Sequence, residues 1–185
     1  MPAPQSRFYE SHGLRLHYAD WGNEGAPPLI LVHGGRDHCR SWDVIARSLQ
    51  PHFHVVAPDL RGHGDSDWTR GGSYALTEYV YDLAQLIRTI AASQVTLVGH
   101  SMGGMVSLIF SGSFPEQVSK LVVTLLLNAG ESFLAGARAA GLERYFPQAR
   151  VETIAGAGHW LQHDKPQEVL GEIRKFLELT EQSAG

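Results

Sequence analysis

A short apolar run that leads into a glycine-flanked serine constrains the fold of this chain more than any other feature. The run covers residues 94–98 and continues into Gly99-His100-Ser101-Met102-Gly103, and a helix-like segment follows at residues 105–110. A G-x-S-x-G pattern between a strand and a helix is typical of a sharp, strained turn that lifts a serine hydroxyl clear of a sheet. Glycine on either side lets the strand and helix approach closely. Ser101 is therefore a candidate nucleophile, the alternative being an inert serine in a glycine-rich loop.

The rest of the chain alternates between strand and helix patterns. Continuous apolar runs at residues 28–32 and 53–57 predict two further buried strands. Helical spacing of apolar residues predicts helices at residues 41–49, with Ser41 as N-cap, and at residues 76–91. In the helix after Ser101, the same spacing predicts a buried face made of Met105, Leu108 and Ile109. This order predicts an α/β fold, in which a mostly parallel sheet has helices on both faces.

The first strands are expected to differ from this pattern. Residues 6–21 alternate in polarity around His12-Gly13, which predicts an antiparallel hairpin with one face in solvent, and His17 is assigned to that face. The carboxyl ends of parallel strands meet at one sheet edge, where ligands bind. His33-Gly34-Gly35, Asp59 and Ser101 each follow a predicted strand, so we expect them at that edge.

Composition narrows the classes of partner. The chain has 185 residues, a net charge of −4 and no run of Lys or Arg, which argues against binding to nucleic acid or to an anionic membrane. No apolar run approaches the length of a membrane span and no signal peptide is visible, so a cytoplasmic protein is expected. Cys39 is the only cysteine, which excludes an internal disulfide. The oligomeric state is not indicated by the sequence.

Four motifs in order resemble one known family. They are His33-Gly34-Gly35, residues 58–66 (PDLRGHGDS), residues 99–104 (GHSMGG) and residues 156–160 (GAGHW). Together they resemble the α/β-hydrolase fold family, and most closely its bacterial serine esterases and hydrolases. The resemblance implies one core domain over residues 1–185 that acts without cofactor or metal.

The resemblance also implies roles for particular residues. Ser101 would be the nucleophile, and backbone N–H groups of Gly35 and Met102 would form an oxyanion hole. His159 is the preferred base among ten histidines, because it follows a predicted last strand at residues 151–154 and a glycine loop. His163 is expected to be solvated, and His100 to point away from Ser101. A minor alternative is that two other histidines, His52 and His54, bind a metal ion together.

The pattern departs from the family after residue 120. Residues 120–128 form one apolar stretch, whereas the family places an inserted cap domain between two strands here. Either one strand replaces two, or a cap segment is missing near residues 123–124. The carboxylate that usually pairs with the base histidine is then absent. Glu131 is the candidate for this role, and Asp59 is a less favoured one. Helices are expected at residues 133–141 and near the C-terminus, the latter with an apolar face made of Val169, Leu170, Ile173, Phe176 and Leu177.

These features predict a serine hydrolase that cleaves small carboxylic esters through an acyl-enzyme. Its open cleft would be flanked by Arg36, Phe133, Trp160 and Leu161, and its partner would be a small-molecule ester. A non-enzymatic or weakly active binding protein of the same fold is an alternative. A carbon–carbon bond hydrolase or lactonase is another. Dehalogenases and epoxide hydrolases are set aside, because they would use an aspartate where Ser101 stands.

Overall fold

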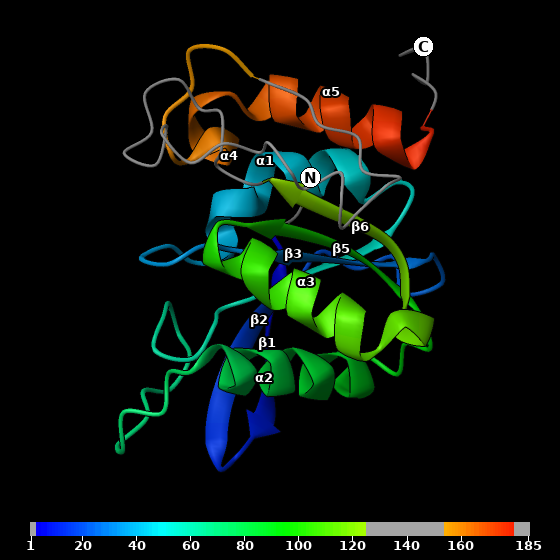
Figure 1. Cartoon of the computed structure of the whole chain (residues 1–185). Coiled ribbons are helices and arrows are strands. Elements are labelled where there is room, and N and C mark those ends of the chain that lie inside the picture. The colour runs from blue at the N-terminus through cyan, green and yellow to red at the C-terminus, as the bar shows by residue number, and fades with distance from the viewer. Residues whose placement is uncertain (1–2, 125–153, 180–185) are drawn as a thin grey trace. The chain divides into compact units, whose positions relative to one another are not determined.

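The computed structural model describes residues 3–124 and 154–179, and the chain divides into two compact units, residues 1–124 and 125–185 (Figure 1). The first unit contains a six-stranded sheet in the order β1-β2-β4-β3-β5-β6. Its strands are β1 (Gln5–Ser11), β2 (Leu14–Asp20), β3 (Pro28–Val32), β4 (His54–Pro58), β5 (Val95–His100) and β6 (Val118–Thr124). Strands β3 to β6 are mutually parallel, and β1 and β2 run antiparallel at one edge, which confirms the predicted fold class.

Helices join the parallel strands of this unit. The elements are the 3₁₀ turn η1 (Cys39–Trp42) and helix α1 (Asp43–Leu49), helices α2 (Leu76–Thr89) and α3 (Met102–Ser113), and the 3₁₀ turn η2 (Pro115–Gln117). Figure 1 shows α2 and α3 together on one side of the sheet and α1 on the other. Helices on both faces explain why the parallel strands read as unbroken apolar runs.

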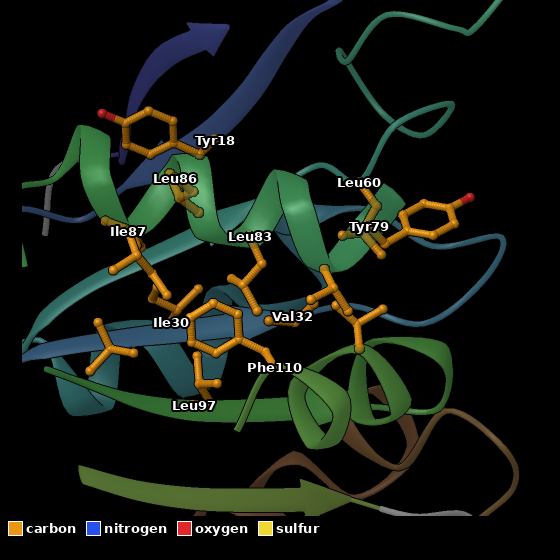
Figure 2. Close-up of a cluster of buried hydrophobic side chains, with 14 of the residues drawn as sticks. Tyr18, Ile30, Val32, Leu60, Tyr79, Leu83, Leu86, Ile87, Leu97 and Phe110 are labelled. Atoms are coloured by element: carbon orange, nitrogen blue, oxygen red, sulfur yellow. The ribbon is translucent and has the colours of Figure 1, made fainter. Parts of the chain in front are cut away.

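A hydrophobic cluster fixes α2 and α3 on their face of the sheet. Helix α2 contributes Leu83, Leu86 and Ile87, and α3 contributes Val106 and Phe110. In Figure 2 the labelled side chains of α2 and Phe110 of α3 lie over the residues of the central strands that face them, which are Ile30, Val32 and Leu97. Every second residue of a strand faces the same side, so one cluster can take its members from several strands. The cluster therefore fixes α3, the helix that directly follows Ser101, against the central strands.

The buried face of α3 differs from the one that its apolar spacing suggests. Met105 and Ile109 are 47% and 38% exposed, whereas Gly103, Val106 and Phe110 are buried. The close approach of helix to strand sets this face, because Gly103 must turn toward β3 and residues three and seven positions later then follow it. Prediction of Met105 and Ile109 as core residues was therefore wrong.

The start of α1 also differs from the prediction. Ser41 does not cap a helix; it lies in η1, and its hydroxyl donates to the carbonyl of His38 at 2.8 Å. The side chain that caps η1 is His38, whose Nδ1 accepts from the Arg40 N–H at 3.2 Å. A tight 3₁₀ turn inserted before the α-helix accounts for the shift in helix start.

The predicted solvent face of the hairpin is exposed on β1 but mostly covered on β2. Arg15 is exposed as expected, but His17 and Ala19 are 4% and 2% exposed although they belong to the face assigned to solvent. Strand β2 is paired on both sides, by β1 and β4, and the side chain of His17 contacts Asp59 and Cys39 from segments outside the sheet. An alternating pattern cannot reveal such cover, because it comes from segments distant in sequence.

The described part of the second unit consists of a loop and two helices. Residues 154–160 form the loop, followed by α4 (Leu161–Asp164) and α5 (Pro166–Leu177). Val169, Leu170, Ile173 and Leu177 are buried along α5 and Phe176 is half-buried, so the C-terminal amphipathic helix is confirmed. The predicted helix at residues 133–141 and all but Ile154 of the predicted last strand lie outside the described residues. Among the described residues, no helix is long and apolar enough to cross a membrane.

Candidate active site

Ser101 occupies a strained turn between β5 and α3. Its backbone angles are φ 51° and ψ −119°, a conformation that non-glycine residues rarely adopt. Strand β5 ends at His100 and α3 begins at Met102, so the turn is a single residue long. Ser101 is only half-buried, in contrast to the wholly buried strand that precedes it. The structure thus confirms the strand–turn–helix geometry expected from the sequence.

The glycines around Ser101 leave no room for a side chain. A Cβ atom on Gly99 would collide with the carbonyl of Gly103, and one on Gly103 would collide with the carbonyls of Val32 and His33. The N-terminus of α3 therefore rests directly on the end of β3. This packing holds the turn in its strained conformation, because neither β5 nor α3 can move away from its neighbours without opening a gap.

The loop after β3 lies against the serine. A Cβ atom on Gly34 would lie 3.0 Å from Cβ of Ser101 and 2.8 Å from Nδ1 of His100. Gly35 follows, half-buried, and Arg36 is exposed with φ 62°. The first N–H groups of a helix, here those of α3 from Met102 onward, have no acceptor within the helix and carry its positive dipole end. The predicted oxyanion donors, Gly35 and Met102, thus belong to two segments that meet at Ser101.

His33 positions this loop and has no free nitrogen for proton transfer. Its Nδ1 donates to the carbonyl of Gly34 at 2.7 Å, and its Nε2 accepts from the N–H of Leu60 at 3.0 Å. Burial lowers the pKa of His33 to about 4, so the ring is neutral at neutral pH. This role was missed from the sequence, where His33 was simply the first residue of a glycine motif.

His100, the residue before the serine, is fully buried beside Gly34. It lies at the end of β5 and belongs to the interior of the sheet rather than to its open edge. The pair His52 and His54 does not form the metal site considered from the sequence. His52 precedes β4 instead of sharing a strand face with His54, and Nε2 of His54 contacts Oδ1 of Asp20 at 3.1 Å.

The loop after β4 is structural, as expected for residues 58–66. One carboxylate oxygen of Asp59 accepts from the N–H of Cys39 at 2.7 Å, and the other accepts from the N–H of Asp65 at 3.0 Å. His17 adds a third bond at 2.7 Å. Burial raises the pKa of Asp59, but these three hydrogen bonds outweigh it, so the pKa lies well below its ordinary value. Its bonding capacity is used in holding segments together, which disfavours the role of catalytic acid.

A buried ion pair continues this loop. Both carboxylate oxygens of Asp82 accept from Arg61, at 2.6 and 2.7 Å, and Arg61 is 1% exposed. The same guanidinium reaches Glu78 at 2.9 Å and the carbonyl of Ser73 at 3.0 Å. The loop is thereby tied to α2.

The predicted base lies in the second unit. His159 follows Gly156, which has φ 66°, and Gly158, whose N–H donates to Asp164 at 2.7 Å. Its ring meets that of Trp160 edge-on, with centroids 5.0 Å apart. Burial lowers the pKa of His159, which favours the neutral form that can accept a proton. Ser101 belongs to the first unit, so the pairing of the two remains a prediction.

The other predicted site residues divide between the two units and the undescribed segment. Arg36 is exposed on the loop that lies against Ser101. Trp160 is 39% exposed, whereas Leu161, the first residue of α4, is 8% exposed. His163 is exposed, as expected. Glu131 and Phe133 lie outside the described residues.

Sequence reasoning missed one side-chain cluster altogether. His17, Cys39 and Asp59 come from three separate segments, and one potential ligand atom from each lies within 4.8 Å of the others. A cavity of about 340 Å³ is lined by these three residues together with Ser6, His38 and Asp65, among others. The register that pairs Tyr18 with Pro58 brings His17 beside Asp59, but no local sequence pattern predicts that register.

Curated relatives match part of the chain. An uncharacterised Mycobacterium tuberculosis protein is 35% identical over 127 residues, which is 69% of this chain and 36% of that protein. Mouse epoxide hydrolase 4 is 36% identical over 112 residues, 60% of this chain and 31% of its own length. A human serine hydrolase-like protein is 34% identical over 104 residues, 56% of this chain and 51% of that protein. The chain thus matches about a third to a half of the length of these relatives.

Solved structures share the architecture. A predicted CIB-like hydrolase from Thermoplasma acidophilum superposes with a TM-score of 0.81 at 18% identity, over 96% of this chain and 99% of that one. The family model for the alpha/beta hydrolase fold matches residues 27–129, which include the two glycine motifs, the loop after β4 and Ser101. By this match over more than half of its length, the chain belongs to the alpha/beta hydrolase fold family.

Proposed function

We propose that this chain is a serine hydrolase that cleaves small carboxylic esters through an acyl-enzyme intermediate. The observation that carries the proposal is the backbone of Ser101, held at φ 51° in a one-residue turn and packed against Gly34. Strain of about 1–3 kcal/mol persists at such a residue only where its surroundings enforce it, and such strain is concentrated at functional sites. The strained residue carries a nucleophilic oxygen, which is the group that acyl transfer requires.

In the proposed reaction, Ser101 Oγ attacks the ester carbonyl and its proton passes to His159. The N–H groups of Gly35 and Met102 stabilise the negative charge on the carbonyl oxygen, and each such donor contributes about 3 kcal/mol to the transition state. His159 then returns the proton to the leaving alcohol, and water releases the acyl group by the same steps. Glu131 is the proposed partner of His159. Loss of the acid that pairs with the base histidine lowers the rate by about ten-thousand-fold without abolishing catalysis. Some activity is therefore expected even without Glu131.

The identity of the elbow residue separates ester hydrolysis from epoxide opening. One relative is named as an epoxide hydrolase. The epoxide hydrolases that this chain resembles would form their covalent intermediate through an elbow aspartate, and Ser101 stands at that place here. A serine alkoxide suits attack on an acyl carbon with an oxyanion site beside it. Esters are therefore the proposed substrate class, with lactones as their cyclic form.

The proposal is tested by hydrolysis of p-nitrophenyl acetate by the whole chain. Ser101→Ala is expected to lower the rate at least about a thousandfold, since the nucleophile is lost. Ser111→Ala is the matched control: this serine lies on the same helix, and its hydroxyl donates to the carbonyl of Ser107 at 2.7 Å. Equal rates for wild type and Ser101→Ala would overturn the proposal and favour a binding protein of the same fold.

A further inference from the structure

We propose that His17, Cys39 and Asp59 form a binding site for one Zn²⁺ ion, separate from the Ser101 elbow. The protein ligands would be Nδ1 of His17, the Cys39 thiolate and a carboxylate oxygen of Asp59. All three side chains are buried, at 4%, 1% and 2% exposure. A thiolate with an imidazole and a carboxylate is a ligand set that favours zinc over magnesium or calcium, which prefer oxygen ligands alone.

The distances suit a tetrahedral ion. Nδ1 of His17 lies 2.7 Å from Oδ2 of Asp59 and 3.9 Å from Sγ of Cys39, and no pair of ligand atoms is more than 4.8 Å apart. Zinc–ligand bonds of about 2.0–2.3 Å place neighbouring ligand atoms roughly 3.3–3.8 Å apart. The observed distances fall on both sides of that range, so binding requires side-chain shifts of about an ångström and no rearrangement of the backbone.

The surroundings already supply the outer partners that such a site needs. Nε2 of His17 lies 2.8 Å from Oγ of Ser6, and a serine hydroxyl can accept as well as donate. Ser6 can therefore support the tautomer that carries its proton on Nε2 and leaves Nδ1 for the metal. Backbone N–H groups of Cys39 and Asp65 fix the carboxylate of Asp59. The adjoining cavity of about 340 Å³ gives room for water at the fourth position.

Charge balance favours a dication over the empty cluster. One Zn²⁺ with one thiolate and one carboxylate is electrically neutral, which suits a buried site. In the metal-free protein, burial and the nearby Asp59 raise the pKa of Cys39 well above its ordinary value, so the thiol is protonated. Binding moves the His17 proton from Nδ1 to Nε2 and releases the Cys39 thiol proton to solvent. Asp65 and Arg40 are the other charged groups that act on this thiol.

The site would join three segments that are distant in sequence. His17 lies on β2, Cys39 opens η1, and Asp59 follows β4. Between β3 and Cys39 runs the loop that carries Gly34 and Gly35, so the bound ion would fix one end of the segment that lies against Ser101. Zinc is therefore expected to stabilise the folded chain, in proportion to the logarithm of its free concentration above Kd.

The test uses chelator-treated full-length protein titrated with ZnCl₂ in a calorimeter, and with CoCl₂ in a spectrophotometer. We expect one ion per chain and a sulfur-to-cobalt charge-transfer absorption. Cys39→Ser should remove that absorption and weaken zinc binding at least about a hundredfold, because loss of an outer partner alone costs roughly 10–100-fold. Ser6→Ala, on the exposed face of β1, keeps all three ligands and should weaken binding about tenfold.

His52→Ala is the matched control, because it removes a half-buried histidine outside the cluster and should leave zinc affinity unchanged. Two results would overturn the proposal. One is no heat or absorption change up to about 1 mM metal. The other is equal affinity in wild type, Cys39→Ser and Ser6→Ala, which would show that surface histidines bind the ion. Ser101→Ala should bind zinc as wild type does, so the outcome is independent of the proposed esterase activity.

Discussion

Two loops at the same edge of the sheet have opposite physical character. The Ser101 turn follows β5 and is strained, half-buried and built around glycines that leave no room for side chains. The Asp59 loop follows β4, and its carboxylate and the neighbouring Arg61 are buried and held by several bonds each. Between them, His33 directly follows β3. Its ring accepts from the N–H of Leu60 in one loop, and its carbonyl abuts Gly103 at the start of α3, beside the other.

The two loops show that the carboxyl end of a parallel strand can hold either a reactive group or a structural one. Parallel strands bring the ends of β3, β4 and β5 together, but position alone makes no site. A group that reacts must be accessible and must keep an unfilled bonding capacity, whereas a group that holds segments together uses all of its capacity. Changes in the Asp59 loop should therefore appear mainly in stability, and changes around Ser101 mainly in activity.

The largest expected stability effect comes from Arg61. Arg61→Ala removes the bidentate partner of Asp82 and leaves a buried carboxylate without its counter-charge, which costs about 3–5 kcal/mol. Urea unfolding of the variant measures this loss. Arg88→Ala, on the exposed face of the same region, should change stability by less than about 0.5 kcal/mol. A similar small change in both variants would remove the distinction drawn for the Asp59 loop.

Asp59→Asn should cost about 2 kcal/mol at neutral pH, because an amide cannot accept from all three of its donors. The pKa of Asp59 is lowered in the folded state, so its stabilising effect is complete above its unfolded pKa of about 4. The effect is lost as pH falls below that value toward the folded pKa. Unfolding of both proteins at pH 7 and at about pH 3.5 should show the gap narrow at the lower pH. A gap that widens would contradict the assigned direction of the shift.

Gly34→Ala tests how closely the glycine loop lies against the serine. The new Cβ would stand 2.8 Å from Nδ1 of His100 and 3.0 Å from Cβ of Ser101, so a shift of the loop is required. We expect a loss of about 1–3 kcal/mol in stability and a fall of about a hundredfold in ester hydrolysis, since small displacements at reacting groups are costly. Gly25→Ala, where an added Cβ meets nothing within 4 Å, is the control for both measurements. Full activity in Gly34→Ala would show that the loop has no part in catalysis.

The smallest expected effect is a gain in the stability of the fold. Ser101→Gly relieves the positive φ of a non-glycine residue and should stabilise the fold by about 1 kcal/mol while removing activity. Ser101→Ala keeps the Cβ atom and the strain, so its stability should match that of wild type. Thermal unfolding of the three proteins compares them directly. A glycine variant less stable than the alanine variant would argue against stored strain at this turn.

The sequence was sufficient for most of the first unit. Apolar runs located β3 and the end of β5, and the G-x-S-x-G pattern placed Ser101 at the turn, because each signal is local. The predictions of buried residues were wrong where long-range packing determines burial. Gly103 set the buried face of α3 against its apolar spacing, and segments outside the sheet buried His17 on a face with a polar pattern.

The candidate site divides in the same way. Ser101 and the glycine loop follow from local motifs and from the shared ends of parallel strands. The neutral state of His33 depends on its burial, and the cluster around Cys39 depends on the register between β2 and β4. Neither can be read from the spacing of residues. The pairing of Ser101 with His159 rests on the family resemblance and stays a prediction.

Covalent labelling with a fluorophosphonate, followed by peptide mapping, tests whether Ser101 is an activated nucleophile. We expect one adduct per chain, located on the peptide that contains Ser101, with labelling abolished in Ser101→Ala and retained in Ser111→Ala. Labelling that survives in Ser101→Ala, or a properly folded wild-type chain that takes up no label, would contradict the claim that this strained turn holds an activated nucleophile.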